Sequence, residues 1–196
     1  GPQSLGGTGK VAMSNASSAL SPVFGTLTIE SGVEIEGYGQ VVGPWVNRGT
    51  IRNTSANTRT LNGNGWVNEG LIDVSVPGGS LALFGSGWSN AATGTMLLND
   101  TTASLSGTYT QAGTLTANNA VINLGGSFTL ANLGVLNLTS TELNQTGTLN
   151  NNAPGGLDIG SFGTEWRLAG GTIIGGSVNG TGPLMVTGNS KVNGVT

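Results

Sequence analysis

The chain has 196 residues, of which about half are Gly, Thr, Asn or Ser and only 8% are charged, for a formal net charge of −3. This composition disfavours helices, because these residue types have low helix propensity, and six Lys and Arg residues are too few to attract nucleic acid or an anionic membrane. The absence of Cys and His excludes disulfides, thiolate chemistry and imidazole catalysis, while a hydrophobic content of 36% is high enough for a folded chain.

Residues 1–22 do not follow the pattern of the rest of the chain. Gly1-Pro2 is typical of the remnant that a protease leaves when it removes an expression tag, and the residues from Ser14 to Pro22 are mostly small. We therefore expect residues 1–22 to be a tag scar followed by an N-terminal cap or a loose arm. The repeats described next occupy residues 23–196.

Short strands begin after this segment. In residues 27–30 and 33–36 the aliphatic side chains share one parity, and Glu30, Glu34 and Glu36 share the other, which is the alternation of a strand with one buried face. Gly residues and four Asn-Gly pairs interrupt such strands and supply the positive φ that tight turns require. A unit of about 20 residues with three short strands cannot bury its apolar side alone, but stacked copies of it can.

The aromatic residues give the period of this unit. They recur about every 20 residues, with one doubled interval, at Phe24, Trp45, Trp66, Trp88, Tyr109, Phe128 and Trp166. Trp45 shares its strand parity with Ile51, so we predict that the rings stack inside the molecule rather than form an external platform. An internal amide ladder that accepts hydrogen bonds from the indole N–H groups is expected two positions after the Trp residues, at Asn47, Asn68 and Asn90.

Charged residues one period apart have opposite signs. The interval from Arg48 to Glu69 equals the one from Trp45 to Trp66, and so does the interval from Arg52 to Asp73. In neighbouring coils these side chains would lie side by side, on the parity opposite to Trp45, so we expect two solvent-exposed cross-rung ion pairs. Each such pair contributes only about 0.2–1 kcal/mol, which helps to set the register without providing the stability.

These patterns predict an all-β fold, a single-stranded right-handed parallel β-helix (β-solenoid) of about nine coils with about 19–22 residues each. The right hand follows from the strong preference of crossovers between parallel strands. Lys191 to Thr196 end in what would be the middle of a coil, so we expect the solenoid to be truncated at its C-terminus. Because no apolar run approaches the length that spans a bilayer, we expect no direct membrane insertion of this segment, and no nucleic acid as a partner.

Three segments resemble the repeats of large bacterial surface proteins: Gly25-Thr26-Leu27-Thr28-Ile29, Trp45-Val46-Asn47-Arg48-Gly49-Thr50-Ile51 and Gly170-Gly171-Thr172-Ile173-Ile174-Gly175-Gly176. In them the chain is similar to filamentous-haemagglutinin-like and autotransporter-passenger β-helices. The resemblance implies an extracellular or bacterial cell-surface location and a role as a stalk or adhesive rod. The partners that it implies are neighbouring modules of the same longer chain and, for an adhesin, surface glycans or other cell surfaces. The Asn-Pro dipeptide of the haemagglutinin secretion cap does not occur in the sequence, which leaves the secretion route open.

Parallel β-helices also include polysaccharide lyases and hydrolases, which need clustered carboxylates. The interval between Asp100 and Asp158, whose replacement would test such an activity, is not a multiple of the period. Glu34 and Glu36 share a strand face near Glu30 and could bind a cation, although a solvated face is the commoner arrangement for such residues. We therefore expect a protein that is not an enzyme and has no catalytic, cofactor-binding or metal site.

The leading hypothesis is a structural or stalk segment that projects other modules or presents a lateral surface for adhesion. The alternative is a carbohydrate-binding adhesin module in which exposed Tyr38 or Phe162 contacts sugar. An ice-binding solenoid is a further alternative, because flat Thr-rich faces order water, but only two of eight outward pairs are Thr-x-Thr: Thr26 with Thr28, and Thr114 with Thr116. A polysaccharide-degrading β-helix enzyme is the last alternative.

Overall fold

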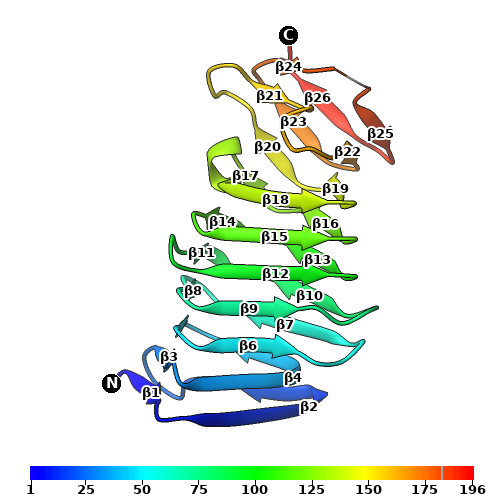
Figure 1. Cartoon of the computed structure of the whole chain (residues 1–196). Helices are drawn as coiled ribbons and strands as arrows, with labels where there is room; N and C mark the ends of the chain where they lie inside the picture. The colour runs from blue at the N-terminus through cyan, green and yellow to red at the C-terminus, as the bar shows by residue number, and fades with distance from the viewer. Residues whose placement is uncertain (182) are drawn as a thin grey trace.

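The computed structural model describes residues 1–181 and 183–196, and parallel strands stack in it as about nine right-handed coils (Figure 1). The predicted all-β solenoid is confirmed. The two termini lie at opposite ends of the stack. The described residues contain one short 3₁₀ turn, η1 (Leu130–Leu133), and no helix among them is long and apolar enough to cross a membrane.

Each coil has three sides, which we name the first, second and third faces in the order in which the chain follows them. The first face contains β1 (Gln3–Leu5), β3 (Leu27–Ile29), β5 (Trp45–Asn47), β8 (Val67–Asn68), β11 (Ser86–Asn90), β14 (Thr108–Gln111), β17 (Ser127–Phe128), β20 (Thr148–Asn150), β23 (Thr172–Ile174) and β26 (Lys191–Asn193). The second face contains β6 (Thr50–Asn53), β9 (Leu71–Val74), β12 (Thr95–Asn99), β15 (Thr114–Asn118) and β18 (Val135–Thr139). The third face contains β7 (Thr58–Asn62), β10 (Ser80–Leu83), β13 (Thr102–Leu105), β16 (Val121–Leu124), β19 (Glu142–Gln145), β22 (Trp166–Ala169) and β25 (Met185–Thr187). A separate two-stranded sheet joins β21 (Leu157–Asp158) to β24 (Val178–Asn179).

Two long strands, β2 (Gly9–Leu20) and β4 (Val33–Val42), each run along both the second and the third face. Residues 34–36 of β4 pair with β6, and residues 39–42 pair with β7. Because β1 pairs with β3 and β2 pairs with β4, residues 3–20 form the first coil, at the end of the stack. Of the two arrangements expected for this segment, a cap or a loose arm, the loose arm is wrong. This coil cannot be recognised from the sequence, because Met13 is the one buried residue of β2 and the strand therefore lacks a regular alternation of apolar and polar residues.

A column of glycines turns the chain from the third face back to the first. Gly63, Gly85 and Gly107 have positive φ angles of 136°, 124° and 87°. A Cβ atom on Gly85 would collide with the carbonyl oxygen of Gly63, and one on Gly107 would collide with that of Gly85. Successive coils therefore touch through their backbones at this corner, which leaves no room for a side chain.

The aromatic stack lies inside, on the first face. Its neighbouring rings have centroids 4.5–5.8 Å apart and interplanar angles of 5–23°, in the order Trp45, Trp66, Trp88, Tyr109 and Phe128. All five side chains are buried. Offset stacking of this kind adds about 0.5–1.5 kcal/mol per pair to the free energy of burial.

The stack does not include Phe24, which is 71% exposed. The strand pairing places Leu27 opposite Trp45, an interval shorter than the one from Trp45 to Trp66. A full period counted back from Trp45 therefore ends in the turn before β3. The prediction for Phe24 is wrong because the second coil is shorter than the coils that follow it.

Trp166 is also outside the stack, although it is buried. It lies on the third face, where β22 pairs with β19 and Trp166 stands opposite Leu143. On the first face Leu149 follows Phe128, and Ile173 follows Leu149. The prediction for Trp166 is therefore wrong, because a multiple of the period was counted across the least regular coils.

Buried Asn side chains form a hydrogen-bonded ladder beside the rings. Asn47 Nδ2 donates to Asn68 Oδ1, and Asn68 Nδ2 donates to Asn90 Oδ1, each over 2.7 Å. All three side chains are fully buried. The ladder pairs amide groups along the core without placing a net charge there, and Asn47 Oδ1 at its start has no partner among the described residues.

The indole N–H groups do not bond to these amides as expected. Trp66 Nε1 donates to the carbonyl oxygen of Phe84, and Trp88 Nε1 donates to that of Ser106, each over 2.9 Å. Trp45 Nε1 has no partner among the described residues. The rings thus reach the backbone of the corner at the end of the third face, while the amides bond along the stack.

We predict that Trp66→Ala lowers the free energy of unfolding by about 3–5 kcal/mol, because it removes a fully buried ring that stacks on both sides. Phe24→Ala is the matched control and should change it by less than about 0.5 kcal/mol, since Phe24 is exposed. Urea unfolding followed by circular dichroism measures both values. Similar losses for the two variants would contradict the assignment of the stack.

Candidate functional site

Charged side chains of the first coils form two networks on the outside of the rod. In one of them Arg48 Nε donates to Glu69 over 2.9 Å, and Arg48 Nη1 lies 3.7 Å from Glu30. The hydrogen bond to Glu69 raises the pKa of Arg48, and the charge of Glu30 adds to this effect. About half of the Arg48 side chain is exposed, so water screens the pair and its contribution to stability is small.

The second network runs from Lys10 to Asp73. Lys10 Nζ lies 2.9 Å from Glu36 and 3.3 Å from Glu34, and Arg52 Nε donates to Glu34 over 3.0 Å. Arg52 also bonds to Asp73. Hydrogen bonds, first from Arg52 and then from Lys10, lower the pKa of Glu34.

Asp73 differs from its predicted exposure. Its side chain is only 7% exposed, whereas it was expected on the solvent side of the strand. Besides Arg52, the carboxylate accepts a 2.6 Å hydrogen bond from Ser75 Oγ, so the buried charge is paired. The alternation of the strand gave the direction of this side chain, but not the neighbours that cover it.

The cation site considered for Glu30, Glu34 and Glu36 does not form. Each of these carboxylates is within ion-pair distance of Lys10, Arg48 or Arg52. Within residues 1–181 and 183–196, no group of three or more acidic side chains is placed to hold a metal ion.

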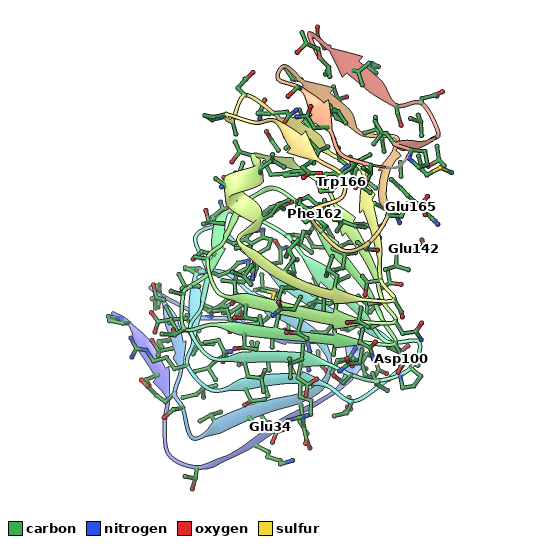
Figure 2. All side chains as sticks on the ribbon, turned by 45° about the horizontal axis from the view of Figure 1, so that its top comes forward. Glu34, Asp100, Glu142, Phe162, Glu165 and Trp166 are labelled. Carbon is green, nitrogen blue, oxygen red and sulfur yellow. The ribbon has the colours of Figure 1, made fainter. Side chains whose placement is uncertain are left out.

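The carboxylates are spread along the rod, and two of them come together near its C-terminal end, where Glu142 and Glu165 both pair with Arg167 over 2.9 Å. Figure 2 shows Glu34 near one end of the rod, Asp100 at the edge of its middle coils, and Glu142 and Glu165 near the other end. Asp100 Oδ1 accepts a hydrogen bond from Asn119 Nδ2 over 2.6 Å. Asp158 Oδ1 accepts one from the backbone N–H of Gly160 over 2.9 Å. Asp100 and Asp158 therefore bond to different partners and do not share a hydrogen-bond network.

Arg59 is a buried cation that the sequence analysis missed. It is fully buried on β7, where Nη2 donates to the carbonyl oxygen of Gly37 and Nη1 lies 3.0 Å from Met13 Sδ. Its Nε atom has no partner among the described residues. Burial lowers the pKa of Arg59 to about 10, so the group is charged at neutral pH without a carboxylate beside it.

The signal for this position was present in the sequence. Arg59 has the same parity as Leu61, which is buried, so β7 directs both side chains inward. In the coil below, a Cβ atom on Gly37 or Gly39 would collide with the backbone of β2, and the carbonyl oxygen of Gly37 is the acceptor for the guanidinium, which no sequence period could reveal. A cation in this position costs desolvation free energy that two weak acceptors do not offset.

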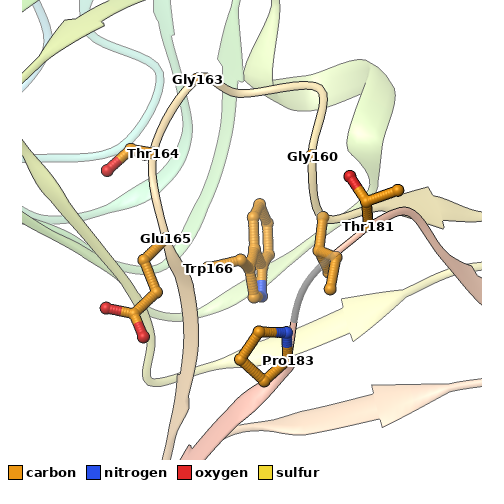
Figure 3. Close-up of a pocket in the computed structure, with 8 residues that line it drawn as sticks. Gly160, Gly163, Thr164, Glu165, Trp166, Thr181 and Pro183 are labelled. Carbon is orange, nitrogen blue, oxygen red and sulfur yellow. The ribbon is translucent and has the colours of Figure 1, made fainter.

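A cavity of about 480 Å³ opens near the C-terminal end of the rod (Figure 3). Glu165 lies on one side of Trp166 there, and Thr181 and Pro183 lie on the other. The indole is only 1% exposed and donates from Nε1 to Gln145 Oε1 over 3.1 Å. Trp166 therefore presents no free ring face on which a ligand could stack.

The polar groups around this cavity are mostly engaged. Glu165 pairs with Arg167 over 2.9 Å. Thr164 Oγ1 donates to the carbonyl oxygen of Thr141. Few hydrogen-bond donors and acceptors around the cavity are thus free to bind a ligand, whereas a typical binding site has several polar groups that converge on the ligand.

The two predicted glycan contacts lie far apart. Tyr38 is half-buried where β4 bends between its two faces, in the second coil. Phe162 is half-buried beside the cavity, with its ring 5.0 Å from that of Trp166 and tilted by 45°. The structure therefore does not combine them in one site.

Comparison of the chain with protein-family models, with curated protein sequences and with solved structures finds no match.

We predict that Arg59→Met leaves the free energy of unfolding unchanged or raises it by about 1–4 kcal/mol, because an apolar side chain of similar length replaces an uncompensated buried charge. The control Arg48→Met removes an exposed pair and should cost less than about 1 kcal/mol. Denaturant unfolding at pH 7 measures both. A loss of more than about 2 kcal/mol in Arg59→Met would mean that its contacts to Gly37 and Met13 stabilise the first coils.

Proposed function

We propose that the chain is a non-enzymatic spacer segment of a bacterial cell-surface or secreted protein, which holds neighbouring modules at a fixed distance. The observation that carries this proposal is the set of ladders that run along the rod: five stacked rings, the buried amides and the glycine column. Each ladder connects one coil to the next, through ring stacking, hydrogen bonds or backbone contacts, so the rod resists bending. The location rests on the resemblance of the repeats to exported β-helices.

The chemistry of the surface supports the same proposal. The six Lys and Arg residues and nine carboxylates are few for 196 residues, and the carboxylates of the first coils are paired with cations. The core ladders consist of neutral amides and rings. Changes of pH and salt therefore alter little of what holds the coils together, which suits a segment exposed to variable surroundings.

A carbohydrate-binding module is the second candidate, and the cavity beside Phe162 is what favours it. The proposed spacer should give no reproducible binding on a glycan array. Binding that is lost in Phe162→Ala, and retained in a control at the distant Tyr38→Ala, would instead favour a sugar site at the cavity.

We predict that two spin labels at the ends of the rod report one narrow distance. The chain has no Cys, so Ala12→Cys and Asn189→Cys, both at exposed positions, can be labelled selectively. Pulsed electron–electron double resonance should give a distance of about 40 Å, the rise of about eight rungs, and it should be the same at low and high salt and from pH 5 to 9. A broad distribution in buffer, like the one expected in urea, would overturn the spacer proposal.

A further inference from the structure

The sheet of the second face ends before the last coils of the stack. It ends at β18, whereas the first face continues through β20, β23 and β26, and the third face continues through β22 and β25. Among the described residues β18 pairs with β15 alone. The next segment of the chain that forms a strand on this side, β21, pairs with β24 instead. One side of the rod thus lacks a strand where its neighbours have one (Figure 1).

The end of this sheet leaves backbone groups of β18 without partners. In a parallel ladder, alternate residues bond to the strand on one side and the residues between them bond to the strand on the other. The carbonyl oxygen of Thr139 accepts a 3.0 Å hydrogen bond from the N–H of Asn119, so residues 135, 137 and 139 bond toward β15. Leu136 and Leu138 direct their N–H and C=O groups the other way, where no described residue bonds to them.

The side chains of β18 are also incompletely buried. Its inward positions continue two apolar columns whose earlier members, such as Met96, Leu98 and Leu115, are fully buried. Leu136 and Leu138 are only half-buried, and the outward Val135 is 57% exposed. An apolar column that stops in this way is stabilised by one more strand in register above it.

The segment that follows β21 is a loop whose first residues bond back to Asp158 and to the carbonyl oxygen of Asn179. Residues 159–165 connect β21 to β22, with Thr164 bonded to the carbonyl oxygen of Thr141 and Phe162 packed on Trp166. Gly160 and Gly163 lie within it, and Gly163 has a positive φ of 66°. The two glycines allow this loop to change its path at low cost.

We propose that the free edge of β18 binds an extended polypeptide segment of another protein, parallel to β18, with apolar side chains at two alternate positions. Only a main chain presents N–H and C=O groups with the spacing that Leu136 and Leu138 require. The apolar columns specify the inward side chains of the bound segment. Since β15 and β18 contain no charged residue, the segment they fit is uncharged.

The direction of the edge selects a single extended segment over a folded partner. The edge points along the rod toward the last coils, whose first and third faces continue past it. The edge strand of a folded domain cannot enter there, because the rest of its sheet would overlap those coils. A single strand occupies the width of one rung, about 4.8 Å.

The test uses nuclear magnetic resonance on the whole chain, with a capped peptide of the sequence Gly-Thr-Met-Leu-Leu-Asn as the probe. This sequence is that of residues 94–99, which already form such a strand on the second face. In the free chain the amides of Leu136 and Leu138 should exchange at least about a hundredfold faster than those of Leu115 and Ala117, which bond to β18. Saturating peptide should slow the exchange of Leu136 and Leu138 and leave Leu115 and Ala117 unchanged.

Two controls distinguish edge pairing from nonspecific contact. The same peptide with N-methyl groups on its Thr and its first Leu cannot donate to β18 and should bind at least about tenfold more weakly. Leu138→Pro removes a donor that points to the free edge and keeps the bonds of β18 to β15, so it should abolish peptide binding, whereas Leu138→Ala should retain it. The peptide control does not depend on whether the proline variant folds.

Three outcomes would overturn the proposal. The first is protection of the Leu136 and Leu138 amides in the free chain equal to that of Leu115. The second is equal affinity for the N-methylated and unmodified peptides. The third is saturating peptide that shifts signals elsewhere but leaves the exchange of both Leu amides unchanged. None of these results bears on the spacer role, because that role depends on the ladders of the other coils.

Discussion

Each coil of this rod can bury its apolar side only against the coils above and below it. A coil has three strands of two to five residues in most of the stack, which is too little to form a core of its own. Stacking in register changes this, because a side chain such as Ile72 then lies between Ile51 and Met96 and becomes fully buried. The same register brings backbone N–H and C=O groups of neighbouring coils into hydrogen-bond distance. Burial, hydrogen bonding and the shape of the molecule therefore depend on one condition: equal positions of successive coils must hold residues that can stack.

This condition restricts which polar groups occur in each column. Equal residues at a spacing of about 4.8 Å repel one another if they carry the same charge, whereas amides and rings attract. The columns of Asn47, Asn68 and Asn90 and of the stacked indoles satisfy the condition with neutral groups. Charged columns occur only where the sign alternates from coil to coil, as in Glu36, Arg52 and Asp73. Arg59 is the exception: its buried guanidinium contacts the carbonyl oxygen of Gly37 and Met13 Sδ in the coils below it.

The period of the sequence was enough to predict the fold, because stacking in register requires similar residues, such as Trp45, Trp66 and Trp88, at regular intervals along the chain. The two errors in the aromatic stack have one physical cause: the number of residues in the turns varies, while the strands remain in register. A shorter second coil moved Leu27 into the position that was expected for Phe24. Irregular turns in the last coils moved Trp166 to the third face.

The sequence also could not predict how far residues of neighbouring coils bury a side chain or a strand edge. Parity gives the direction of a side chain, but the exposure of Asp73 depends on neighbours from other coils. The open edge of β18 left no trace in the spacing, because Val135 to Thr139 alternate like any other strand of the second face. The difference is that no described strand pairs with the other side of β18, and this can be recognised only when the three faces of the structure are compared.

The end of the second face also explains where this rod can interact with other molecules. In a regular coil the main chain is bonded on both sides, so its groups have no capacity left for a partner, and the exposed Thr, Ser and Asn side chains bond along the same columns, as Thr58 does to Ser80. Leu136 and Leu138 keep their polar groups free, and the apolar column beneath them stops at the same place. Ordered columns make the rod stiff and nearly inert along its sides. The coil that ends the second face supplies hydrogen-bonding capacity and apolar surface together, and these are the two properties that recognition of an extended strand requires.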